Sequence, residues 1–299
     1  MKIEKESANV GVNIKEVEMG DSYTIGIYEK AMPGELTWKE KLIAAKEAGY
    51  DYVEISIDET DEKLARLDMT REERNELVKL MQENSIPIRT MCLSGHRKYP
   101  MGSKEAMTQK RSMEIMEKAI ILADDLGIRI IQLAGYDVYY EESDKETKAI
   151  FLKNLRFAVE MAAKYGVLLA FETMETDFMN TVKKAMDYVS LVDSPYLLVY
   201  PDLGNITNAA KENRADVKED LESGRGHIAA VHIKETIPGK FREIPFGRGH
   251  VDFPSLIEKC YLMGVRKYVT EFWYVGSDTW KEELAETNKR FRDILNKFK

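Results

Sequence analysis

The sequence has little cysteine, no long apolar run and no excess of positive charge. Its 299 residues include two cysteines, Cys92 and Cys260, which are too few for a thiolate zinc site. We expect both to be reduced thiols in the core. No apolar run approaches the ~18 residues that span a bilayer, and residues 1–20 lack the basic-then-apolar order of a signal peptide. These absences predict a cytoplasmic protein with no membrane partner.

Positive charge is in deficit along the whole chain. Lys and Arg number 44 against 52 Asp and Glu, which gives a formal net charge of −8, and the two signs are interleaved. Proteins that bind nucleic acid need a clustered excess of cations to displace counterions. We therefore expect no nucleic-acid partner.

Short β-rich apolar runs alternate eight times with amphipathic helical stretches. The predicted strands cover residues 23–28, 52–57, 86–93, 128–134, 167–172, 197–200, 228–233 and 265–271. The predicted helices cover residues 37–48, 70–84, 103–126, 145–164, 180–192, 209–222, 253–263 and 279–298. No Pro-, Gly- or Ser-rich linker interrupts the series. The pattern predicts one (β/α)8 TIM barrel over residues 21–299, preceded by a short N-terminal extension, residues 1–20.

Ionisable residues end the last four predicted strands, and the carboxyl ends of barrel strands meet at one rim. These residues are Glu172, Asp202, His232 and Glu271. Any one of them alone would suit a helix cap or a core position. Three buried carboxylates together would be costly without a cation. The set predicts a divalent metal site, for which Mn²⁺ is the first choice and Zn²⁺, Co²⁺ and Mg²⁺ are alternatives.

Further polar residues at the same rim are candidate substrate contacts. Glu54 ends the second predicted strand, and either a sugar hydroxyl or the next helix would be its partner. His96 and Arg97 follow the third strand in MCLSGHRKYP. A basic pair beside a glycine suits an anion or a hydroxyl, while a solvated loop is the alternative.

The segment 234–252 is unusually long for a loop in a compact barrel, which favours a functional role. It contains Lys234, Arg242 and the pair Gly247 and Gly249, and it follows the seventh strand, where barrels commonly hold a phosphate. We predict that this loop binds the phosphate of a small substrate. An ordinary tight turn is the alternative interpretation of the glycine pair.

The two glutamates of the predicted metal site stand three strands apart and would flank a sugar bound over the metal. Glu172 and Glu271 are therefore the candidate acid and base: one removes a proton from the carbon beside a carbonyl, and the other returns a proton to the opposite face. The cation stabilises the enediolate that develops. Asp202 and His232 would act mainly as ligands.

Several segments together resemble the L-ribulose-5-phosphate 3-epimerase family of the xylose-isomerase-like barrel superfamily. They are GIYEKAMPG, DYVEISIDETDEKLARLD, MCLSGHRKYPMGS, IIQLAGYDVYY, YPDLGN, AAVHIKET and IPFGRGHVDF, and the match covers about residues 23–275. The resemblance implies a metal-dependent enzyme that interconverts L-xylulose 5-phosphate and L-ribulose 5-phosphate at carbon 3, in L-ascorbate or related pentose catabolism. It also implies a homo-oligomer, a dimer.

The superfamily pattern falls on the same four residues, Glu172, Asp202, His232 and Glu271. The chain departs from the free-ketose epimerases at Asn205, where those enzymes usually have a histidine, so a free ketohexose is disfavoured and Asn205 becomes a candidate substrate contact. An aldose–ketose isomerase on the same barrel and a non-enzymatic sugar-binding protein are the alternatives. A relative of endonuclease IV would need more histidines and a basic DNA-binding face.

Overall fold

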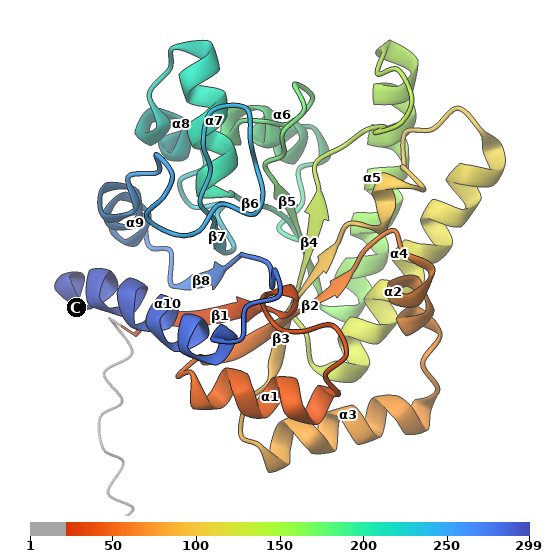
Figure 1. Ribbon diagram of the computed structural model, residues 1–299. Coiled ribbons are helices and arrows are strands. Elements are labelled where there is room, and N and C mark those ends of the chain that lie inside the picture. The colour runs from red at the N-terminus through yellow and green to blue at the C-terminus, as the bar shows by residue number, and fades with distance from the viewer. Residues whose placement is uncertain (1–21) are drawn as a thin grey trace, which may run out of the picture.

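A parallel β-barrel lies at the centre of the molecule (Figure 1), and the computed structural model describes residues 22–299. Its strands are β1 Thr24–Tyr28, β2 Tyr52–Ile57, β3 Ile88–Leu93, β4 Ile130–Ala134, β5 Leu168–Glu172, β6 Leu197–Tyr200, β7 Val231–Ile233 and β8 Lys267–Thr270. Their order is β6-β5-β4-β3-β2-β1-β8-β7, with every pair parallel. The predicted TIM barrel is confirmed. The predicted extension, residues 1–20, lies outside the described residues.

The seam between β6 and β7 differs from the other strand pairs. There the ladder is reduced to two isolated parallel bridges, Val199 with Ile228 and Asp202 with His232. The first bridge involves Val199 of the short β6, and the second, two residues after the end of β6, joins two residues of the predicted metal site. The barrel thus closes at the point where the predicted metal ligands lie.

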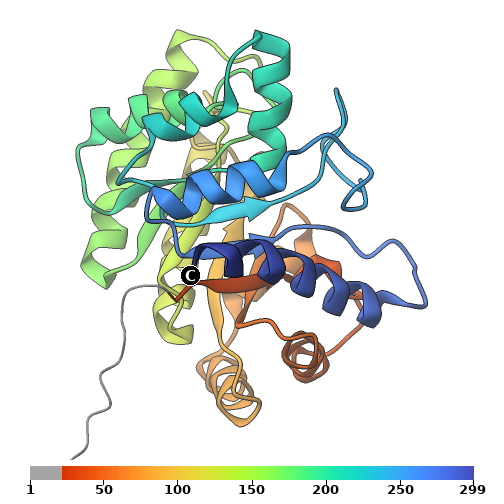
Figure 2. The ribbon, with the colours of Figure 1, turned by 90° about the vertical axis from the view of Figure 1, so that its left-hand side faces the viewer.

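Helices surround the barrel, as Figures 1 and 2 show. They are α1 Trp38–Glu47, α2 Asp61–Ala65, α3 Arg71–Glu83, α4 Ala106–Leu126, α5 Lys145–Tyr165, α6 Val182–Val192, α7 Leu203–Asn213, α8 Val217–Ser223, α9 Phe253–Leu262 and α10 Trp280–Leu295. Short 3-10 turns occupy Glu29–Ala31, Arg66–Asp68, Gly95–Arg97 and Asn296–Phe298. Threonines with a partner glutamate begin α1 and α3 through capping boxes. No helix in residues 22–299 is long and apolar enough to cross a membrane.

One predicted helix, 209–222, is wrong in its bounds and its continuity. The structure has two helices there, α7 and α8, because Arg214 adopts a left-handed conformation with φ 52° and ends α7. Helix α7 also begins six residues earlier than predicted. Asp202 caps its first turn, so the helix starts directly at the rim of the barrel.

Buried aromatic side chains fill part of the barrel interior, and one of them, Tyr52, lies on the amino-terminal side of the polar cluster. Tyr52 crosses the interior from β2, and its hydroxyl donates to the Tyr268 carbonyl of β8 at 2.9 Å. Gly26 makes room for it, since a Cβ there would lie 2.3 Å from the Tyr52 ring. Both cysteines, Cys92 and Cys260, are buried free thiols, as predicted.

Candidate active site

Four side chains from four neighbouring strands meet at the carboxyl end of the barrel. Glu172 is the last residue of β5, Asp202 caps α7 just after β6, His232 is central in β7, and Glu271 follows β8. One ligand atom from each lies within 4.8 Å of all the others, and all four residues are buried. The structure therefore brings together the four residues that the sequence marked as metal ligands.

The two nitrogens of His232 have different partners. Nε2 lies 2.6 Å from Glu54 Oε1, and the second oxygen of Glu54 accepts a hydrogen bond from Tyr200 at 3.0 Å. Nδ1 lies 3.3 Å from Glu172 Oε1 and 3.2 Å from Glu271 Oε2. Burial disfavours the charged ring, but Glu54 and Glu271 raise the pKa of His232 well above its usual value. With Nε2–H donating to Glu54, Nδ1 is the nitrogen that faces the cluster.

Asp202 uses its two oxygens separately. Oδ1 accepts from the Asn205 backbone N–H at 2.7 Å, which caps α7, whereas Oδ2 lies 2.9 Å from Lys234 Nζ. Lys234 Nζ is also 3.5 Å from Glu271 Oε2. Burial raises the pKa of Asp202 to about 7, in opposition to Lys234. Lys234 and His232 together overcome burial at Glu271 and lower the pKa of that carboxyl below its usual value.

The charges and donor atoms of this cluster fit a bound metal ion. Glu172, Asp202 and Glu271 supply three carboxylates, and Lys234 supplies one ammonium group within the same buried site. When all three carboxylates are ionised, two negative charges remain that the lysine does not neutralise, and burying them would be costly. A divalent cation balances these two charges. Oxygen donors with one imidazole suit hard and borderline divalent ions. The cluster can hold a divalent metal ion.

Gln132 holds one of the two flanking glutamates. It lies in β4, is fully buried, and its Nε2 donates a hydrogen bond to Glu172 Oε2. Oε1 of the same glutamate is the oxygen that faces His232. The sequence analysis missed Gln132. Its only signal is a lone amide at an inward position of the apolar strand IIQLA.

A cavity of about 210 Å³ lies over the cluster. Its wall includes Glu172 and Glu271 as well as four residues predicted to contact substrate: Arg97, Asn205, Lys234 and Arg242. The wall also includes residues that the sequence analysis did not single out: Tyr28, Lys30, Asp58, Phe241 and Trp273. Nothing in their local sequence distinguishes them, because they reach the cavity from four separate strand ends.

Two of these lining residues are held in fixed orientations. The amide nitrogen of Asn205 donates to the Thr173 carbonyl at 2.7 Å, while its Oδ1 is buried with no partner. This oxygen is therefore available to accept a substrate hydroxyl. The Arg97 guanidinium stacks 4.8 Å from the Tyr139 ring centroid and donates to the Tyr136 hydroxyl at 3.3 Å.

The structure places the other predicted substrate contacts outside the cavity wall. Glu54 lies beneath it as the partner of His232. His96 is buried with Nε2 3.1 Å from the Ser112 carbonyl, and burial lowers its pKa to about 4. Gly247 donates its backbone N–H to Glu235 Oε2 at 3.0 Å, and Gly249 packs against the same carboxylate. The glycine-containing loop thus surrounds an anion of the protein itself.

Comparisons with known proteins agree with this geometry. A family model described as a xylose isomerase-like TIM barrel matches residues 42–294. The chain is 46% identical over 266 residues to L-ribulose-5-phosphate 3-epimerase UlaE of Escherichia coli O139:H28, which spans 89% of this chain and 91% of that protein. The UlaE protein of Shigella sonnei gives the same values.

Solved structures of sugar epimerases share the fold. A D-psicose 3-epimerase from Clostridium cellulolyticum H10, crystallised with D-tagatose, has a TM-score of 0.76 at 17% identity and covers 91% of this chain and 99% of its own. An L-ribulose 3-epimerase has a TM-score of 0.69 at 18% identity, with coverage of 91% and 98%. The extent of the family match and the identity to the UlaE proteins show that this chain belongs to the L-ribulose-5-phosphate 3-epimerase family of xylose isomerase-like TIM barrels.

Proposed function

We propose that the protein is a metal-dependent 3-epimerase that interconverts L-xylulose 5-phosphate and L-ribulose 5-phosphate. The observation that carries this proposal is the convergence of two glutamates from β5 and β8 on one imidazole nitrogen. Glu172 Oε1 and Glu271 Oε2 both lie within 3.3 Å of His232 Nδ1, at the base of a cavity that both residues line. A ketose bound in that cavity has a carboxylate beside each face of its carbon 3.

Proton transfer between these faces inverts the configuration. In one direction Glu172 removes the proton from carbon 3 and Glu271 supplies a proton to the opposite face, and in the other direction the two residues exchange these tasks. Gln132 holds Glu172 in the orientation needed for this step. Lys234, whose ammonium lies beside Glu271, lowers the pKa of that carboxyl and keeps it ionised for the direction in which Glu271 removes the proton.

Glu172, Asp202, His232 Nδ1 and Glu271 would hold the divalent ion, for which Mn²⁺ is our first choice. When bound, the ion polarises the carbonyl beside carbon 3 and stabilises the negative charge that develops there. Asp202 is fixed for this ligand role by the cap of α7, and His232 by Glu54.

Cationic and polar groups of the cavity wall would bind the rest of the substrate. Arg97 and Arg242 supply two guanidinium groups for the phosphate, and Lys30 lies at the same wall, although it is paired with Asp58. The free Oδ1 of Asn205 would accept a hydroxyl of the sugar. His96, Gly247 and Gly249 have no direct contact in this proposal, because other protein groups occupy them.

We further place the protein in the cytoplasm as a homodimer. Sugar phosphates are intracellular metabolites, and the two buried, unpaired cysteines suit a reducing compartment. The dimer rests on the family resemblance.

Isotope exchange tests the proposal against its alternatives. The chelator-treated protein is supplied with Mn²⁺ and L-xylulose 5-phosphate in D₂O, and deuterium at each carbon is followed by NMR. We expect label at carbon 3 together with L-ribulose 5-phosphate, and the loss of both in Glu172→Gln and Glu271→Gln by orders of magnitude. The variant Glu117→Gln, at an exposed position of α4, is the matched control.

Two outcomes would contradict the epimerase. Label or an aldehyde at carbon 1 would assign an aldose–ketose isomerase. No exchange with Mn²⁺, Zn²⁺, Co²⁺ or Mg²⁺, combined with saturable binding of the sugar phosphate, would assign a non-enzymatic binding protein.

A further inference from the structure

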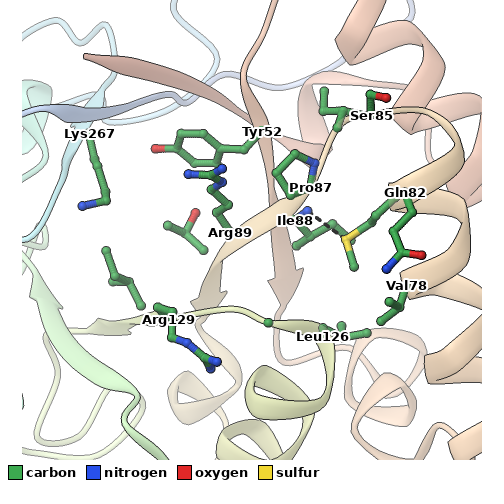
Figure 3. Close-up of a pocket in the computed structure, with 15 residues that line it drawn as sticks. Tyr52, Val78, Gln82, Ser85, Pro87, Ile88, Arg89, Leu126, Arg129 and Lys267 are labelled. Atoms are coloured by element: carbon green, nitrogen blue, oxygen red, sulfur yellow. Dashed lines mark hydrogen bonds between the residues drawn. The ribbon is translucent and has the colours of Figure 1, made fainter. Parts of the chain in front are cut away.

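A second cavity lies at the opposite, amino-terminal mouth of the barrel (Figure 3). Its volume is about 560 Å³, and its wall includes the first residues of β2, β3, β4 and β8 with the last turns of α3 and α4. Small-molecule sites commonly measure ~300–1,000 Å³. The catalytic cluster lies at the carboxyl ends of the strands, so this amino-terminal pocket is a separate site.

Tyr52 forms the floor that separates the two sites. It is 1% exposed, and its hydroxyl is bonded to the Tyr268 carbonyl across the barrel. None of Glu172, Asp202, His232 and Glu271 lines the pocket, so a ligand there would not contact the catalytic residues.

Three cationic side chains border the pocket: Arg89, Arg129 and Lys267. Arg89 lies in β3 and Arg129 directly precedes the neighbouring β4, and the Arg129 backbone N–H donates to the Arg89 carbonyl at 3.4 Å. Arg129 reaches Asp124 at 3.5 Å. Within residues 22–299, no ion pair or side-chain hydrogen bond engages Arg89 or Lys267. Cations that lie together without counter-ions repel each other, so an anion bound between them would be stabilised. The chain as a whole carries a net charge of −8, so this local group of cations stands out against the overall charge.

The remainder of the wall is largely apolar. Val78 and Met81 of α3, Leu126 of α4 and Ile130 of β4 contribute to it. Figure 3 shows Val78, Gln82 and Leu126 on the side of the pocket away from Lys267 and Arg89. The pocket thus has a cationic end and an apolar end. A sugar body would bury its hydroxyls against the apolar end without partners, so a sugar phosphate fits poorly.

We propose that the amino-terminal pocket binds a small organic anion with a phosphate or carboxylate head and an apolar body of a few carbons. The head lies against Arg89 and Lys267, which lack counter-ions of their own. The body lies against Val78, Met81 and Leu126.

Calorimetry on the metal-loaded full chain tests this proposal. Hexyl phosphate and hexanoate are titrated in the presence of saturating L-xylulose 5-phosphate, which keeps the active site occupied, and the tighter of the two identifies the head group. Butyl phosphate, hexanol and inorganic phosphate are titrated in parallel. We expect saturable binding of one equivalent, about fourfold tighter for each added methylene between butyl and hexyl phosphate, and at least tenfold weaker binding of hexanol and inorganic phosphate.

Variants of exposed pocket residues locate the binding. We expect the double variant Arg89→Gln, Lys267→Gln to weaken hexyl phosphate binding at least tenfold, and Gln82→Glu to weaken it by placing a negative charge in the wall. The double variant Lys39→Gln, Arg71→Gln removes two exposed cations elsewhere and serves as the matched control. All three should retain the wild-type kcat/KM. Absence of saturable binding by both anions, or wild-type affinity in the Arg89, Lys267 variant, would overturn the proposal, and so would equal binding of hexanol.

Discussion

At the scale of single residues, the site depends on a carboxylate that does not face the substrate. Glu54 of β2 lies 178 residues from His232 in the sequence, yet it bonds to the ring across the barrel. The convergence of the four candidate ligands could be predicted because each lies in or directly after an apolar strand of its own. The roles of Glu54 and Gln132 could not, since both depend on which inward side chains meet across the barrel, and no local pattern encodes that contact.

The variant Glu54→Gln tests this link. It keeps the shape of the side chain and a hydrogen-bond acceptor for Nε2–H, but it removes the charge that makes Nδ1 a strong ligand. We expect ~10–100-fold weaker metal binding, as for other carboxylate partners of metal-binding histidines, measured by calorimetric titration of Mn²⁺. Turnover at saturating metal should recover most of the wild-type rate. Tyr200→Phe, which retains the carboxylate, is the control with a smaller effect, and unchanged affinity in Glu54→Gln would contradict the link.

At the scale of elements, the loop between β7 and α9 is organised by its own buried anion. Glu235 is 3% exposed and accepts backbone N–H groups from Gly247 at 3.0 Å and from Thr236 and Val251 at 3.2 Å. The composition of the segment predicts an anion among these amides, but sequence alone does not distinguish an external phosphate from a carboxylate of the chain. This internal anion fixes the loop that carries Phe241 and Arg242 to the cavity wall.

The variant Gly249→Ala should release this loop. A Cβ at that position would lie 2.2 Å from Glu235 Oε1 and 2.3 Å from the Thr236 carbonyl, and the backbone carbonyl cannot move away cheaply. We expect the KM for L-xylulose 5-phosphate to rise about tenfold or more, with a smaller change in kcat, because Arg242 loses its position while the metal ligands keep theirs. Steady-state kinetics at saturating Mn²⁺ measure both. Gly34→Ala, whose added Cβ would contact nothing within 4 Å, is the matched control. A wild-type KM in Gly249→Ala would show that the loop does not position the substrate.

At the scale of the whole molecule, the alternation of strands and helices was sufficient to predict the barrel, because each strand–helix unit carries its own apolar pattern and turn residues. The way in which the barrel closes was harder to predict from the sequence. The seam between β6 and β7 is reduced to two bridges beside a four-residue β6, and the left-handed Arg214 divides the helices that follow β6. Both are local backbone outcomes that hydrophobic periodicity does not report.

The metal should therefore stabilise one seam of the barrel more than the rest of it. Asp202 and His232 stand on opposite sides of the β6–β7 seam, whose hydrogen bonds include Ala229 N–H to the Val199 carbonyl and His232 N–H to the Pro201 carbonyl, both 2.9 Å. A bound ion joins the two sides and favours the closed form. We expect chelation to speed hydrogen exchange of these two amides at least tenfold and added Mn²⁺ to reverse it, while amides of the continuous β2–β3 ladder keep their rates. Equal acceleration in both ladders would mean that the ion stabilises the barrel as a whole, and no acceleration would remove the ion from its closure.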